Sequence, residues 1–290
     1  MRTKAAVFSL ATILSIALHA QDQEPKPWKC SGKVGFNFSQ SHLSNWAAGG
    51  QSALNSLALF RYDANYAKNQ VKFDNNIDIN LGYSLIGKLK PIKTDDKIEI
   101  NSSYGRKATE KIYYSTAFSF KSQLRDGFNY AKDSTNPISK IFSPAYITLG
   151  FGGDWKPSEA MSFTWLPLTG RLTIVADDSL SAKGAFGVEA GKKLKTELGS
   201  KATIRFKKEI FTNVTLTSKL ELFSDYLKNP QNIDIDFQNL IVMKVNSWMN
   251  ANISAHLIYD NNIKITDKDG KTGPRTQFKE VLSIGLSHAF

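Results

Sequence analysis

The chain has 290 residues, with 37 Lys+Arg against 26 Asp+Glu, a formal net charge of +11, and one cysteine. This length is enough for a single domain with a large core, and one cysteine excludes a framework of intramolecular disulfides. The positive charge suits contact with anionic partners but does not identify one. A solvated basic surface explains the charge equally well.

The N-terminus has the pattern of a secretory signal peptide. Two basic residues precede an apolar stretch that ends at Leu18, and a polar run begins at Gln21. The apolar stretch is too short to span a bilayer comfortably. We therefore expect an exported protein with a signal peptide at 1–20, an N-terminal extension at 21–32 and a folded domain at 33–290.

Much of the chain alternates apolar and polar residues with a period of two. At 71–85 the odd positions are apolar except for Asn75, and the even positions are charged, amide or small. Because side chains alternate faces along a β-strand, this segment is predicted to be a strand with one apolar face. The same pattern recurs at 112–125, 214–222, 233–245 and 249–259. Strands of this length with one polar face are typical of a transmembrane barrel, whereas soluble strands usually have about five or six residues.

We expect about twelve strands joined by connections of alternating length. The expected strands are 33–40, 53–66, 70–86, 96–106, 111–125, 144–155, 160–166, 196–211, 214–226, 232–245, 249–260 and 276–290. Short turns are expected at 67–69, 107–110, 156–159, 212–213 and 246–248. Longer connections are expected at 41–52, 87–95, 126–143, 167–195, 227–231 and 261–275, and the strand at 160–166 is ended by Pro167 because proline interrupts a strand ladder.

The alternation of short and long connections predicts the fold class. Short turns at one end and long loops at the other are typical of the periplasmic and extracellular ends of a bacterial barrel. The prediction is an all-β protein, a single transmembrane antiparallel β-barrel of about 12 strands with short periplasmic turns and longer extracellular loops. The expected location is the outer membrane of a Gram-negative bacterium.

The last strand has a distinctive end. Leu282, Ile284, Leu286 and Phe290 share its apolar face, the opposite face carries small residues, and the sequence stops at Phe290. A strand that ends on an aromatic residue resembles the signal by which outer-membrane barrels are recognised for insertion. We therefore expect Phe290 to be that insertion signal and the barrel-assembly machinery to be a partner.

Five short motifs carry a family resemblance. The most specific is Asn45-Trp46-Ala47-Ala48-Gly49-Gly50, and the weaker ones lie at 184–188, 222–226, 257–261 and 277–280. With these motifs the chain resembles a family of uncharacterised outer-membrane proteins of Bacteroidota-type Gram-negative bacteria. The resemblance implies an outer-membrane β-barrel with no assigned activity, and it carries over no catalytic residue.

The most specific motif has two interpretations. Asn45, Trp46, Gly49 and Gly50 lie in a loop expected at the extracellular end, where ligands would arrive, and the two glycines allow positive φ. We favour a structural loop over a ligand site.

No enzyme or cofactor is expected. Ser254 and His256 share a strand face, but residues two apart on a strand lie about 7 Å from each other, so they are not a ready catalytic pair. No Gly-x-Ser-x-Gly element occurs. The segment that starts at Asp267 lacks a calcium loop's glutamate at the twelfth position, which is Phe278, so no metal site is expected either.

The charged residues of the polar faces are the candidate functional surface. If these faces line a lumen, they contribute Lys72, Asp74, Asp78, Lys97, Glu99, Lys121, Arg125, Arg205, Lys207, Glu209, Lys219, Glu221, Asp234 and Asp236. Bases and acids balance, which argues against a steep filter of one sign. Two functions stay open: a narrow pore or small-solute channel, and a structural or accessory barrel, plugged by the 167–195 loop, that acts through envelope-assembly or secretion partners.

The surplus positive charge then belongs to the loops. Examples are Lys88, Lys90, Lys93, Lys192, Lys193 and Lys195. Lysines on extracellular loops would meet anionic lipopolysaccharide. The expected partners are outer-membrane lipid and lipopolysaccharide, the assembly machinery and an envelope protein, but no nucleic acid.

Overall fold

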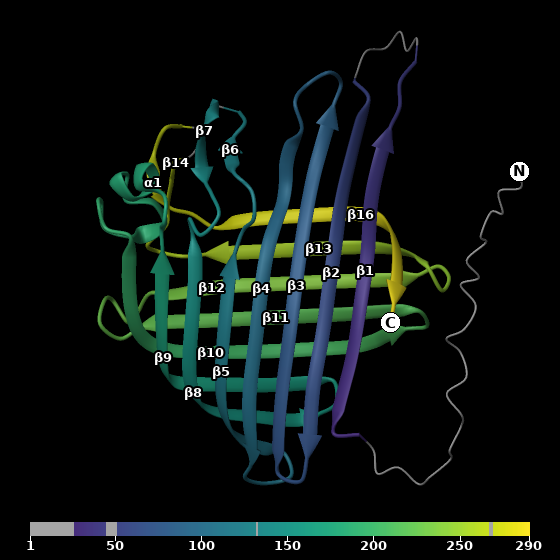
Figure 1. Ribbon diagram of the computed structural model, residues 1–290, viewed down its shortest axis with the longest axis vertical. Coiled ribbons are helices and arrows are strands. Elements are labelled where there is room, and N and C mark those ends of the chain that lie inside the picture. Colours follow the sequence, from purple (N-terminus) through teal and green to yellow (C-terminus); the bar gives the residue numbers. More distant parts are fainter. Residues whose placement is uncertain (1–25, 45–50, 132, 267–268) are drawn as a thin grey trace, which may run out of the picture.

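The computed structural model describes residues 26–44, 51–131, 133–266 and 269–290. Its main feature is a closed antiparallel barrel of twelve strands, in the order β1-β16-β13-β12-β11-β10-β9-β8-β5-β4-β3-β2 (Figure 1). These strands are β1 (Trp28–Ser41), β2 (Ala53–Lys68), β3 (Val71–Ile86), β4 (Ile92–Lys107), β5 (Ile112–Ser122), β8 (Ala145–Ser158), β9 (Met161–Ile174), β10 (Leu194–Phe211), β11 (Val214–Asp225), β12 (Ile233–Lys244), β13 (Met249–Tyr259) and β16 (Gln277–Ala289). The predicted all-β, twelve-stranded barrel is confirmed.

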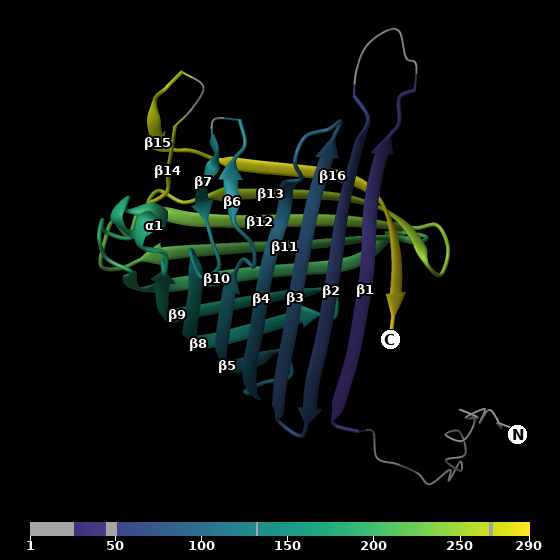
Figure 2. The same cartoon turned by 45° about the horizontal axis from the view of Figure 1, so that its top comes forward.

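The two ends of the barrel differ as the sequence predicts. At one end, here called the turn end, consecutive strands are joined by two to four residues. At the other, the loop end, the longer connections carry small elements of their own (Figure 2). These are β6 (Gly127–Asn129) with β7 (Asp133–Ser139), helix α1 (Asp178–Ala182) with the 3-10 turn η1 (Ala185–Gly187), and β14 (Lys264–Thr266) with β15 (Thr272–Pro274). The expected signal peptide lies outside the described residues.

The wall of the barrel has an apolar outer face and a polar inner face. Register pairs such as Phe73↔Tyr104 join apolar side chains, whereas Asp78↔Glu99 joins charged ones. Leu282 on the outer face is 68% exposed, but Glu99 on the inner face is only 6% exposed. This is the reverse of a water-soluble fold and matches a wall that faces hydrocarbon. No helix among the described residues is long and apolar enough to cross a membrane.

Strand β16 forms one corner of the barrel because it changes partner along its length. Residues 277–286 pair with β13 and residues 284–289 pair with β1, so the two registers overlap only around Gly285. Figure 1 shows the strand running along β13 and then turning beside β1. A Cβ at Gly285 would overlap the side chains of Asn37, Asn250 and Asn252. Glycine therefore lets these amide side chains approach the strand where it bends.

The predicted strand end at Pro167 is wrong. Strand β9 continues to Ile174, and the connection that follows is shorter than the expected 167–195 loop. Pro167 lies in a β-bulge, where the register with β10 shifts between Gly199 and Lys201. Since a bulge leaves a residue outside the ladder, the missing proline N–H breaks no ladder hydrogen bond. The neighbouring Gly152 of β8 leaves room for it, because a Cβ there would overlap the β9 backbone.

Candidate functional site

The lumen is crossed by a charge belt, defined here as Glu99, Lys121, Lys219, Glu221 and Asp236. Lys219 Nζ of β11 lies 3.2 Å from Glu99 Oε1 of β4, and Lys121 Nζ of β5 lies 3.1 Å from Asp236 Oδ2 of β12. In each pair, four strands separate the partners on the shorter way around the barrel and six on the longer. The partners therefore come from opposite walls, and they meet in the middle of the lumen.

Further polar groups contact the residues of the charge belt. Lys219 and Lys201 each lie 3.1 Å from Glu221 Oε1. The Asn101 side chain donates to Glu99 at 3.0 Å, the Gln238 amide donates to Asp236 at 2.8 Å, and His256 Nε2 lies 2.8 Å from Asp236 Oδ1. Each carboxylate therefore has several partners, which is what a charge withdrawn from bulk water needs. His256 contacts Asp236 and not Ser254.

A second ionic cluster lies toward the loop end. Arg171 of β9 contacts Glu197 of β10 at 2.8 Å and Asp234 of β12 at 2.7 Å, and Lys195 contacts Glu197 at 2.8 Å. The Arg171 guanidinium also lies 4.0 Å from the ring centroid of Phe223. Because the predicted strand ends at Pro167, Arg171 was not predicted as a lumen residue and Lys195 was predicted to lie in a loop. The alternation that continues through Arg171, Leu172, Thr173 and Ile174 is the signal that could have identified them.

The loop end carries a small packed unit, the loop cap, defined here as residues 175–188 together with Lys140. Val175, Leu180 and Val188 form a small apolar cluster around α1. Lys140, just after β7, contacts Asp177 at 2.6 Å, and Asp177 caps α1 by accepting the Leu180 N–H at 3.0 Å. The hydrogen bond from Lys140, followed by that from Leu180, lowers the pKa of Asp177. The same hydrogen bond, which Lys140 donates to Asp177, raises the pKa of Lys140.

The lumen near the turn end is more open than the charge belt. Arg205, Lys207 and Lys244 share the inner face with Lys219 and Asn250, yet they are exposed. Exposed side chains on an inner face indicate water-accessible space. We call this region the turn-end chamber, defined by Lys33, Arg205, Lys207 and Lys244.

The structure places most predicted lumen residues on the inner face. Lys72 pairs with Asp154 of β8, Asp74 lies 3.8 Å from Lys156, and Asp78 lies 4.0 Å from Arg61. Lys97 lies 3.3 Å from Glu99, and Glu209 accepts the N–H of Asn213 at the β10–β11 turn. The remaining residues, apart from Arg125, belong to the charge belt, the Arg171 cluster and the turn-end chamber.

Arg125 is placed differently. It lies beyond the end of β5, is exposed at the loop end, and its N–H donates to Asp96 at 2.8 Å. The period-two pattern extends past Ser122, but the strand ladder does not.

The loop lysines differ in their ionic partners. Lys93, Lys192, Lys193 and Lys195 contact Asp96, Glu189, Asp178 and Glu197, respectively. Lys88 and Lys90 have no ion pair within the described part of the chain. The motif residues Asn45, Trp46, Gly49 and Gly50 lie outside the described residues.

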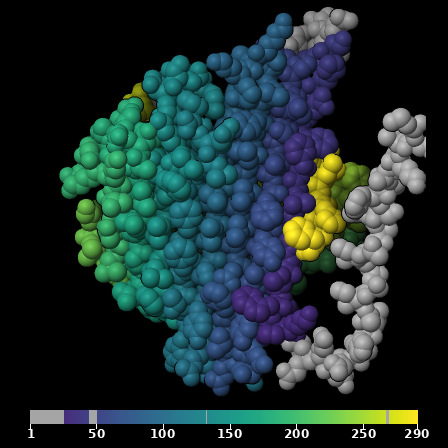
Figure 3. Space-filling model, in the orientation of Figure 1, coloured from purple at the N-terminus to yellow at the C-terminus, as the bar shows by residue number. Residues whose placement is uncertain are grey.

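Phe290 extends the β16 ladder against β1. Its N–H and C=O exchange hydrogen bonds with Gly32, at 2.9 and 2.7 Å. A Cβ at Gly32 would overlap the Phe290 ring, so the ring lies over this glycine. Figure 3 shows the C-terminal end of the chain packed against β1 on the outside of the barrel.

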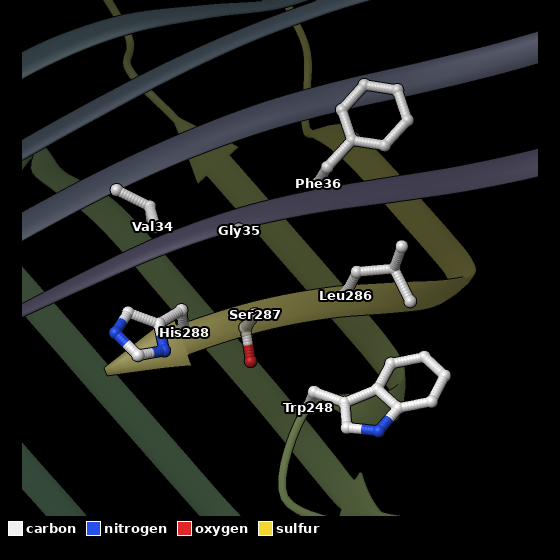
Figure 4. A pocket seen from close by; sticks show the side chains of 7 residues that line it. All are labelled: Val34, Gly35, Phe36, Trp248, Leu286, Ser287 and His288. Carbon is white, nitrogen blue, oxygen red and sulfur yellow. The ribbon is translucent and has the colours of Figure 1, made fainter. Parts of the chain in front are cut away.

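A shallow pocket of about 420 Å³ lies on the outer side of this corner, away from the charge belt. Figure 4 shows Val34 and Phe36 on β1, Leu286 and His288 on β16, and Trp248 beneath them. Its lining is mainly apolar, as expected of a surface that faces hydrocarbon. Among the described residues, no three potential metal ligands gather in one place.

A family model described as a protein of unknown function (DUF3078) matches residues 38–128. No curated protein matches the sequence.

Solved structures similar to this chain include the COG4313 outer membrane channel from Pseudomonas putida F1, with 11% identity, 95% of this chain and 100% of that chain covered, and a TM-score of 0.43. The translocator domain of autotransporter NalP from Neisseria meningitidis has 10% identity, coverage of 93% and 90%, and a TM-score of 0.39. The NanC porin has 10% identity, coverage of 90% and 98%, and a TM-score of 0.39.

Proposed function

We propose that this protein is an outer-membrane β-barrel that acts as a narrow channel for small hydrophilic solutes. The observation that carries the proposal is the charge belt, which crosses a polar lumen inside a barrel whose outer face is apolar. A polar lumen offers a path for water and solutes, and the paired side chains restrict its width.

The proposed location rests on the two faces of the wall and on the N-terminal sequence. A closed barrel leaves no sheet edge in hydrocarbon, and its apolar outer face suits lipid. The signal-like segment at 1–20 suits export. The turn end would then face the periplasm and the loop end the outside of a Gram-negative cell.

Solute uptake into proteoliposomes tests the channel. We expect vesicles containing the purified protein to swell in glycine or glucose and to exclude larger sugars such as raffinose. E99A/K219A removes one of the two pairs that cross the lumen and leaves Lys121–Asp236 in place. It should extend uptake to larger solutes, because two of the crossing side chains are shortened and the net charge is unchanged. The matched control, E189A/K192A, removes an exposed ion pair from a loop. Vesicles that take up none of these solutes would contradict the proposal.

The alternative is an accessory barrel that is closed by its loops and acts through an envelope protein. The loop cap favours it, because the apolar cluster and the Lys140–Asp177 contact hold α1 at the loop end. The N–H of Val175 donates to the carbonyl of Lys193 at 2.8 Å, so the two ends of this loop already lie together. Residues 176–192 can therefore be replaced by a short Gly-Ser linker without breaking the β9–β10 register.

This deletion separates the two functions. A channel limited by the charge belt should keep its solute cut-off when the loop is shortened. If the barrel is closed by its loops, vesicles with the full-length protein should take up no solute, and vesicles with the deletion variant should take up solutes. This result would favour the accessory function.

The proposed lipid partner can be tested at the loops. Lys88 and Lys90 lie in the β3–β4 connection, and both are exposed. We expect K88E/K90E to weaken binding to lipopolysaccharide micelles, because like charges repel. Equal binding of this variant and the unchanged protein would overturn the lipopolysaccharide contact.

A further inference from the structure

The charged residues of the lumen are not evenly distributed along the barrel axis. In the charge belt and the Arg171 cluster, acids and bases contact one another directly. In the turn-end chamber, Lys33, Arg205, Lys207 and Lys244 have no ion-pair partner among the described residues. The overall balance of lumen charges in the sequence therefore conceals an excess of positive charge at one end.

The nearby carboxylates neutralise these bases only in part, because Arg61 and Lys72 already pair with most of them. Asp63 is held by Arg61 through two contacts at 2.9 and 3.0 Å, and Asp78 also lies near Arg61. Asp154 is paired with Lys72. Glu209 accepts a hydrogen bond from the turn at Asn213.

The bases of the chamber come from different parts of the wall and share one space. Lys33 lies on β1, Arg205 and Lys207 on β10, and Lys244 on β12. Lys33 is within electrostatic range of Lys207, Lys244 and Arg61. Arg205 pairs in register with Lys219, so it marks the boundary between the chamber and the charge belt. Several bases that face a common water-filled space concentrate anions there.

We propose that the turn-end chamber is a binding site for small oxyanions, carrying carboxylate or phosphate groups, and that it makes the lumen anion-selective. The anion selectivity rests on the proposed channel function, because it requires conduction. Anion binding does not depend on conduction. The balanced charge belt limits size, whereas the unpaired bases supply the preference for sign. Anions reach the chamber from the turn end without crossing the belt.

Two neighbouring lysines allow a matched test. Lys207 faces the lumen, and Lys208 points outward in the next position of β10. K207Q and K208Q remove the same charge from the same strand. We expect a KCl gradient across a planar bilayer to give a reversal potential on the anion-selective side. The Cl⁻/K⁺ permeability ratio should fall in K207Q and more strongly in K33Q/K207Q, but not in K208Q.

Binding gives a second measurement that needs no conduction. Calorimetry of the detergent-solubilised protein at low salt, with succinate and inorganic phosphate as separate probes, should detect binding to the unchanged chain, K208Q and K207R, and a loss in K33Q/K207Q. Tighter binding of succinate than of phosphate would assign the site to organic acids, and the reverse would assign it to phosphate. A folded-barrel band on a heat-shift gel confirms that each variant folds.

The outcomes separate the site from the channel. Binding without conductance would keep the anion site and remove the channel. A conducting barrel that prefers cations, or one in which K207Q and K208Q behave alike, would overturn the anion site and leave the channel. Absence of binding for both probes would also overturn it.

Discussion

At the scale of single residues, the structure depends on charges that are paired across the lumen. Glu99 is almost fully buried and contacts Lys219 and Lys97, with Asn101 as a further donor. Removing one partner of a buried pair leaves the other uncompensated, which costs more than removing both. The pairs therefore couple the two walls of the barrel.

Glu99→Gln should be destabilising. We expect the free energy of unfolding in urea, followed by tryptophan fluorescence, to fall by about 1–3 kcal/mol, because Lys219 loses its transverse partner and keeps only Glu221. The double variant E99Q/K219M should recover part of this loss. The control Glu189→Gln, in an exposed loop pair, should leave stability unchanged. A double variant less stable than the single one would contradict this explanation.

The Lys140–Asp177 contact should make the loop cap sensitive to acid. Asp177 has a lowered pKa in the folded protein, so its contribution is fully present above its unfolded pKa of about 4. The contribution is lost as the pH falls through the lower folded value. Limited proteolysis between residues 175 and 193 should therefore accelerate below about pH 4, while the strands stay protected. Asp177→Asn should be cleaved faster at pH 7 and show less change with pH.

At the scale of elements, the corner at β16 closes the barrel. Six residue pairs join β1 to β16, whereas fourteen join β1 to β2. The closing seam between β1 and β16 is therefore the shorter of the two ladders of β1. Phe290 extends the seam by two hydrogen bonds and covers Gly32. The end of the chain therefore contributes to closure, in addition to its expected role as an insertion signal.

Deleting Phe290 should reduce assembly. We expect a lower amount of heat-modifiable barrel in the outer membrane, because two hydrogen bonds between Phe290 and Gly32 are lost, together with the proposed insertion signal. Phe278→Ala is the matched control, since this phenylalanine lies on the same outer face at the other end of β16 and is similarly exposed. Normal levels of the chain lacking Phe290 would remove its assignment as the signal.

Much of this architecture could be predicted from the sequence, because strand period and connection length are local properties. The pattern at Val71–Leu85 identified a strand and both of its faces correctly. Pro167 misled the prediction, since a proline at a bulge and a proline at a strand end look alike in sequence. The transverse contact between Lys219 and Glu99 could not be predicted, because it depends on how closely the walls approach.

At the scale of the whole molecule, the barrel combines an apolar outer face with a lumen divided along its axis. The loop cap lies at one end, the charge belt crosses the interior, and the unpaired bases face the turn end. In the proposed channel, the size and the charge sign of the solute would be controlled at different levels of the same lumen.

The single-channel conductance of the unchanged protein and of E99A/K219A in the same planar bilayer tests the central claim most directly. The unchanged protein should open to a small conductance, and the variant to a larger one, because only one of the two transverse pairs, Lys121–Asp236, still crosses the lumen. E189A/K192A should match the unchanged protein. Equal conductance of all three, with each barrel folded, would contradict a lumen whose width is set by the charge belt.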